Sequence, residues 1–175
     1  MGESYLKLGD RAVTALAFAL LVLMLAIVAQ VLFSALDVNP VARFGTDLPL
    51  LGDAITLNSL LDFQWHLLVI TGLVPAGLVW LLDRHVRVDF IYQARSTRAK
   101  ARIDLLGNLV FAVPFLALAI PAAIDVLRRA WRSDEGSRNG GLNDLWLIKA
   151  VLPLGLTLLA LAIALETIRL IRSAR

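Results

Sequence analysis

The 25 residues AVTALAFALLVLMLAIVAQVLFSAL, at positions 12–36, form a continuous apolar stretch without a charged side chain. An α-helix rises about 1.5 Å per residue, so about 20 apolar residues cross the roughly 30 Å of hydrocarbon in a bilayer. Three further stretches reach that length, at positions 63–82, 105–124 and 145–165. The sequence therefore predicts an all-α integral membrane protein with four transmembrane helices, organised as a single membrane domain over residues 1–175.

The composition supports this fold class. Hydrophobic residues make up 59% of the chain before glycine is counted, whereas soluble domains have about 45–50% with glycine included. Because each stretch is continuously apolar and a bilayer requires every backbone amide to bond within its own segment, we predict helices rather than open sheets. The first stretch is longer than the core of a signal peptide, about 7–15 residues, so we interpret it as a retained span. The chain has no cysteine, which excludes disulfides, thiolate metal sites and cysteine nucleophiles.

The basic residues predict the orientation in the membrane. The N-terminal tail, the loop after the second stretch and the C-terminal tail hold 11 Lys and Arg residues, whereas the opposite side has 6, counting Lys149 just inside the last stretch. By the positive-inside rule, both termini are predicted to be cytoplasmic. A net charge of +3 and a pI near 9.8 would also suit nucleic-acid binding, but the basic residues flank the predicted spans. Contact with anionic lipid headgroups is the simpler interpretation, so membrane lipids are a predicted partner and nucleic acid is not.

The predicted spans hold few polar side chains that could do chemistry. None has a carboxylate near its middle, which argues against a proton-coupled drug exporter. His66 lies one helical turn after Asp62, and Trp65 beside it suits a headgroup anchor. Lys149 lies about one turn inside the last span, where its side chain can reach the outer surface. Prolines at positions 75, 114, 121 and 153 favour kinks in the helices.

Two histidines raise the possibility of a haem site. His66 and His85 are 19 residues apart along one helix and its continuation, or roughly 28 Å at 1.5 Å per residue. They cannot ligate one haem within a single chain, although two copies or two proteins could do so. A haem-binding membrane anchor of a redox enzyme is therefore the alternative function. Phosphate loops, G-x-S-x-G and H-E-x-x-H motifs are missing from the sequence, so no catalytic, cofactor-binding or metal-binding residue is predicted.

The segment after the second span, D-R-H-V-R-V-D-F-I-Y from Asp83, interleaves apolar and charged residues before Ser96 and Thr97 introduce a basic helix. It can be read as an interfacial segment among headgroups, or as a docking element for a second membrane subunit. Asp89 lies among arginines at a level where anionic lipids repel it, so we expect it to pair with a cation, and Arg87 is the candidate. The residue chemistry alone leaves both interpretations open.

Three motifs resemble a known family. They are L-L-D-F-Q-W-H-L-L at 60–68, H-V-R-V-D-F-I-Y at 85–92 followed by I-D-L-L-G at 103–107, and G-G-L…W-L-I-K-A-V-L-P-L-G at 140–155. The chain resembles the small membrane (Q) subunit of tripartite ATP-independent periplasmic (TRAP) transporters. The resemblance implies a bacterial inner-membrane importer in which a periplasmic solute-binding protein and a large membrane (M) subunit accompany this chain.

The resemblance also implies sodium-coupled uptake of small organic acids, with substrate and ions carried by the large subunit. This chain would then be a non-catalytic scaffold without a cofactor, and the scarcity of charge inside its predicted spans agrees with that role. The residues that we predict to contact partner subunits are Asp62, Gln64, Trp65, His66, His85, Arg87, Asp89 and Lys149.

Overall fold

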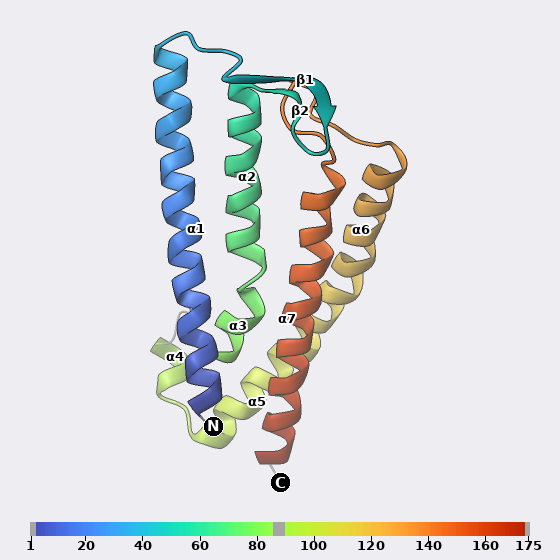
Figure 1. The fold of residues 1–175 in the computed structure, drawn as a ribbon. Helices are drawn as coiled ribbons and strands as arrows, with labels where there is room; N and C mark the ends of the chain where they lie inside the picture. The colour runs from blue at the N-terminus through green and yellow to red at the C-terminus, as the bar shows by residue number, and fades with distance from the viewer. Residues whose placement is uncertain (1–2, 86–89, 174–175) are drawn as a thin grey trace. The chain divides into compact units, whose positions relative to one another are not determined.

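The computed structural model describes residues 3–85 and 90–173 (Figure 1). Four helical stretches in it are long and apolar enough to cross a membrane, namely Gly9–Ala35, Leu57–Leu81, Thr97–Arg132 and Trp146–Arg172. The predicted all-α membrane fold with four spans is thereby confirmed. The elements, in chain order, are α1 (Glu3–Ala35), β1 (Ala42–Leu48), β2 (Gly52–Ile55), α2 (Leu57–Leu73), α3 (Ala76–Leu81), α4 (Phe90–Gln93), α5 (Thr97–Gly107), the π-helix η1 (Asn108–Ala112), α6 (Val113–Arg132) and α7 (Trp146–Ser173).

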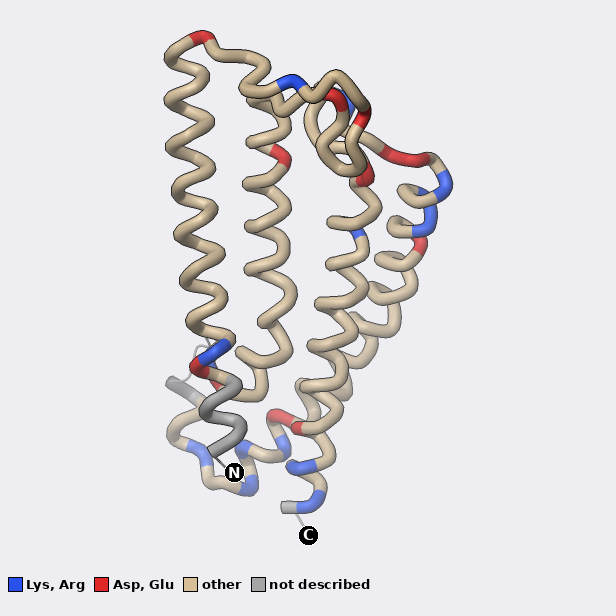
Figure 2. The backbone as a smooth tube through the Cα atoms, in the orientation of Figure 1, with Lys and Arg blue, Asp and Glu red and all other residues tan. Residues whose placement is uncertain are grey.

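The chain forms two compact units. The first comprises the chain up to Leu73 together with Asp125–Val151, and the second comprises Val74–Ile124 together with the chain from Leu152 onward. Figure 2 shows that charged residues gather in the loops and at helix ends, while the middles of α1 and α2 hold none. Those apolar stretches can therefore lie in hydrocarbon.

In the first unit, α1 and α2 run side by side (Figure 1). Gln64 on α2 donates its side-chain amide to the backbone carbonyl of Ala26 on α1, at 3.3 Å. This bond satisfies a polar side chain that would otherwise lie unpaired between two apolar helices.

A small antiparallel hairpin, which the sequence analysis did not predict, follows α1. Its strands pair Ala42 with Ile55 and Leu48 with Gly52, with an irregularity between Arg43 and Leu48. Gly52 has a φ of +71° at the turn, a conformation that glycine adopts without steric cost. The hairpin covers the beginning of α2 (Figure 1).

The helices α1, α3 and α6 end in the same way. Each is followed by an aspartate in the left-handed conformation, namely Asp37 at φ 52°, Asp83 at φ 54° and Asp134 at φ 46°. The next N–H in each case bonds to the carbonyl five residues earlier, from Val38 to Phe33, from Arg84 to Val79 and from Glu135 to Ala130, at 2.9–3.2 Å. This is the Schellman arrangement, in which a left-handed residue satisfies carbonyls at a helix C-terminus.

Prolines and the π-helix shape the second unit. Pro75 stands as the N-cap of α3; it separates α3 from α2 because proline lacks an N–H and clashes with the carbonyl four residues earlier. The π-helix η1 directly precedes Val113-Pro114, and its wider turn can accommodate the same clash. The basic helix expected after Ser96 and Thr97 is α5, and Ser96 caps it by accepting the N–H of Ala99 at 3.4 Å.

Candidate functional site

The first unit holds a network of hydrogen bonds that we call the loop clasp, in which α2 and the turn before it hold residues 139–142 of the third loop. Asp62 accepts the backbone N–H of Leu142 with its carboxylate, at 3.0 Å. Thr56 donates its hydroxyl to the carbonyl of Gly140 at 2.7 Å. Asn58 donates its amide to the carbonyl of Asn139 at 2.5 Å. Each bond joins groups about 80 residues apart in the sequence.

Gly141 is packed tightly within the loop clasp. A Cβ on this residue would clash with the carboxylate of Asp62 and would lie 2.7 Å from the hydroxyl oxygen of Ser137. Leu142 beside it is 5% exposed. Because Gly141 has no side chain, the loop backbone can approach Asp62 closely at this residue of the third motif.

The hairpin holds the other end of the same loop. The N–H of Asn143 donates to the carbonyl of Leu50 at 2.8 Å, and the N–H of Leu50 donates to the carboxylate of Asp144 at 3.1 Å. The side chain of Lys149 forms an ion pair with Glu135. The third loop is therefore bonded to both α2 and the hairpin.

Three other predicted contact residues lie in the first unit. Gln64 faces α1, as described above, whereas Trp65 is 59% exposed. His66 contacts Asp62 through the backbone: its Nδ1 donates to the Asp62 carbonyl oxygen at 2.5 Å. The carboxylate of Asp62 is directed to the loop clasp instead. The other ring nitrogen of His66, Nε2, is buried, and none of the described residues bonds to it.

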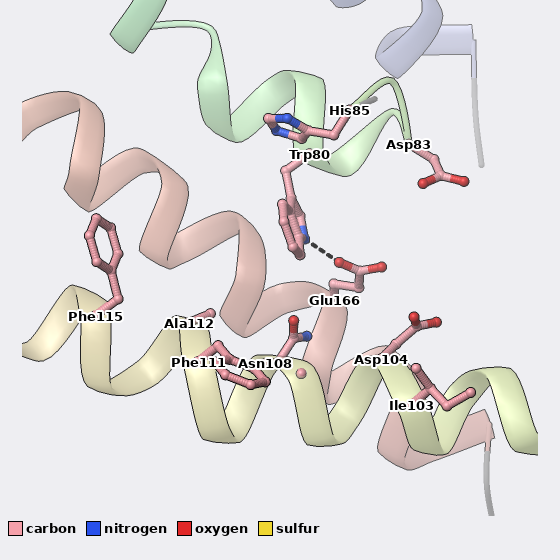
Figure 3. Close-up of a pocket in the computed structure, with 11 residues that line it drawn as sticks. Trp80, Asp83, His85, Ile103, Asp104, Asn108, Phe111, Ala112, Phe115 and Glu166 are labelled. Atoms are coloured by element: carbon pink, nitrogen blue, oxygen red, sulfur yellow. Dashed lines mark hydrogen bonds between the residues drawn. The ribbon is translucent and has the colours of Figure 1, made fainter. Parts of the chain in front are cut away.

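The second unit contains a cavity of about 680 Å³ between α3, α7 and the helix that runs from α5 through η1 into α6 (Figure 3). Trp80 donates its indole N–H to Glu166 at one wall. Asn108, 5% exposed, donates to the hydroxyl of Thr167 at 3.0 Å. Figure 3 shows Phe111 and Phe115 toward one end of the cavity and the carboxylates of Asp104 and Glu166 toward the other. One end of the cavity is therefore aromatic and the other is acidic.

Glu166 was missed in the sequence analysis because the fourth predicted span ended one residue before it. In the structure α7 continues to Ser173, so Glu166 lies inside a helix long and apolar enough to span the membrane. Asp104 accepts the hydroxyl of Tyr92 at 2.6 Å, so this carboxylate is also hydrogen-bonded. A useful signal was Trp80, because an indole N–H in an apolar span requires an acceptor.

His85 is exposed, and its ring lies 5.5 Å from that of Trp80. Arg87 and Asp89, the predicted pair, fall outside the described residues. In the described part of the chain, no three His, Cys, Asp or Glu side chains come together as a metal ion would require.

The comparisons with known proteins assign the family. The family model described as tripartite ATP-independent periplasmic transporters, DctQ component, matches residues 49–173. Searches of curated proteins and of solved structures gave no match to the chain. The matched range contains α2 and every later helix, and with them the residues of the loop clasp and of the cavity. The chain therefore belongs to the DctQ family and is the small membrane subunit of a TRAP transporter.

Proposed function

We propose that this chain braces the large membrane subunit of a sodium-coupled importer of small organic acids, and that its outer loops help to dock the periplasmic binding protein. We place it in the bacterial inner membrane with both termini on the cytoplasmic side. In the assembled transporter we expect residues 1–175 to form a single membrane domain. Membership of the DctQ family supports the subunit's place in a tripartite transporter. The cavity of the second unit and the loop clasp support the two contacts with partner subunits.

The cavity of the second unit is the surface that we assign to the large subunit. Its lining combines Phe111, 75% exposed, with a hydrogen-bonded carboxylate, Glu166. A carboxylate in a span is unfavourable in lipid unless it faces protein or a polar cavity. Exposed aromatic side chains around a partly polar hollow are typical of contact surfaces between proteins. An exposed phenylalanine beside a carboxylate within a candidate span is the observation that best supports the bracing role.

The loop clasp supports the docking role. Hydrogen bonds within the first unit already hold the hairpin and the third loop in one conformation. A surface that is ordered before binding loses less conformational entropy when a partner docks. Asp62 and Lys149 bond to the third loop from α2 and α7, so we propose that they position the loops. The exposed Trp65 remains available for direct contact with a partner.

Co-purification of the large subunit with this chain tests the bracing role. Phe111→Ala removes an exposed phenyl group from the cavity, and the matched control Phe18→Ala removes one that is 68% exposed on α1. Truncating an interface anchor costs about 2 kcal/mol or more, so we expect Phe111→Ala to lower recovery of the large subunit and uptake of substrate. Phe18→Ala should leave both unchanged. Equal recovery with the two variants would contradict the assignment of this surface.

The same preparations test the remaining parts of the proposal. Uptake of a labelled organic acid should follow an imposed sodium gradient. The alternative function, a haem-binding anchor, predicts a Soret band in the absorbance spectrum of the purified chain. The buried, unbonded Nε2 of His66 is the observation that favours the alternative, and a colourless preparation would contradict it.

A further inference from the structure

A second hollow lies in the first unit, at the end of α6 and the beginning of α7. Its volume is about 250 Å³, and we call it the arginine–tryptophan pocket; it is lined by Leu127, Arg128, Trp131, Arg132, Trp146 and Ala150. The rings of Trp131 and Trp146 meet edge to face, with centroids 4.3 Å apart. The two indoles therefore form a fixed wall beside two guanidinium groups.

The pocket lies at the ends of two candidate spans, where the boundary between hydrocarbon and lipid headgroups is expected. One candidate span ends at Arg132, and the next begins at Trp146. The pocket thus lies within about one turn of the ends of two membrane-spanning helices. Tryptophan and arginine are favoured at this depth, because each has an apolar body and a polar group that can reach the headgroups.

The charge of the pocket is positive and largely uncompensated. Arg128 contacts Asp125 at 3.4 Å, but both side chains are more than half exposed, so the pair is weak. Among the described residues, no carboxylate pairs with Arg132, and the nearby Glu135 pairs with Lys149 instead. A pocket with one weakly paired guanidinium group, on Arg128, and one without a paired carboxylate among the described residues, on Arg132, attracts an anion.

We propose that the arginine–tryptophan pocket binds the phosphodiester of an anionic phospholipid. Arg128 and Arg132 lie one turn apart on α6, and guanidinium groups donate pairs of hydrogen bonds to phosphate oxygens. The acyl chains then continue along Leu127, Ala150 and the indole rings. Free phosphate would leave this apolar lining without a contact. A zwitterionic lipid would bring a cationic headgroup that the two arginines repel. The pocket therefore selects an anionic lipid.

Lipid retention measured by native mass spectrometry tests this proposal with the full chain. The chain is purified in the presence of phosphatidylglycerol or of phosphatidylcholine, and the bound lipid is counted as detergent is added. We expect retention of phosphatidylglycerol, at least tenfold lower retention of phosphatidylcholine, and no displacement by millimolar inorganic phosphate. Displacement by phosphate alone would identify an adventitious anion site and would overturn the assignment to a lipid.

The variants separate the pocket from general surface charge. The double variant R128Q/R132Q should lose at least tenfold in retention, whereas R129Q should not, because Arg129 is also an exposed arginine on the same helix but does not line the pocket. W131L keeps both charges and should also lose retention. Equal losses in R129Q, or full retention in W131L, would refute the proposal. Lost recovery of the large subunit in R128Q/R132Q, with lipid retained, would assign the pocket to that partner instead.

Discussion

Replacement of Gly77 by alanine should destabilise the second unit, because Gly77 on α3 lies directly against the backbone of α7. A Cβ at this position would lie 2.6 Å from the carbonyl oxygen of Leu158 and 2.9 Å from its carbonyl carbon, where ordinary contacts are 3.4 Å or longer. The neighbouring atoms are backbone atoms, which cannot rotate away as a side chain can. The two helices must therefore separate by about 0.8 Å, the difference between 3.4 and 2.6 Å.

Gly72 provides the matched control. It also lies in a helix of the same candidate span, but a Cβ there meets nothing within 4 Å. Alanine is favoured over glycine in helices by about 0.5–1 kcal/mol, and this gain applies to both positions. Overpacking costs about 1–3 kcal/mol. The difference in the free energy of unfolding between Gly72→Ala and Gly77→Ala therefore isolates the packing term, and we expect Gly77→Ala to be less stable by about 1–3 kcal/mol.

Unfolding of the purified chain in an SDS titration, followed by far-ultraviolet circular dichroism, measures this difference. Gly77→Ala should also weaken the contact between Trp80 and Glu166, which joins the same two helices, and so lower the recovery of the large subunit. If Gly77→Ala is as stable as Gly72→Ala, α3 does not approach α7 as described, and the geometry of the cavity is wrong.

Further predictions concern orientation, the loop clasp and the ion pair. Because the chain has no cysteine, single introduced cysteines can be labelled without background. An impermeant thiol reagent added from outside should label Asn139→Cys and not Gln93→Cys, and the opposite pattern would contradict the predicted orientation. A cysteine at the buried Leu142 should react at least about tenfold faster after Asp62→Ala, since hydrogen bonds to charged groups contribute about 1.5–3 kcal/mol; an unchanged rate would refute the clasp. Lys149→Met should lower the free energy of unfolding of the purified chain by no more than about 1 kcal/mol, because the ion pair with Glu135 is partly exposed. A larger loss would contradict this and show that the pair is shielded from water.

The sequence was sufficient to predict features that depend on local physics. The four membrane-spanning helices follow from apolar length, and the beginning of α5 follows from a serine that caps its first turn. The loop clasp could not be predicted, because Asp62 bonds to a backbone N–H 80 residues away and nothing in the pattern specifies that partner. The position of Glu166 was missed because hydropathy ended the predicted span at residue 165, whereas the backbone of α7 stays helical to Ser173.

The left-handed aspartates after α1, α3 and α6 have a consequence for how deeply these helices sit in a bilayer. Each aspartate comes two residues after the last residue of a candidate span, with the spans ending at Ala35, Leu81 and Arg132. Glycine would stop a helix equally well, but it would allow the helix to slide along its axis. An aspartate resists sliding, because drawing its charge toward the bilayer centre costs about 2.5–3.5 kcal/mol on insertion scales. One residue at each of these ends therefore sets both the length of a helix and its vertical register in the membrane.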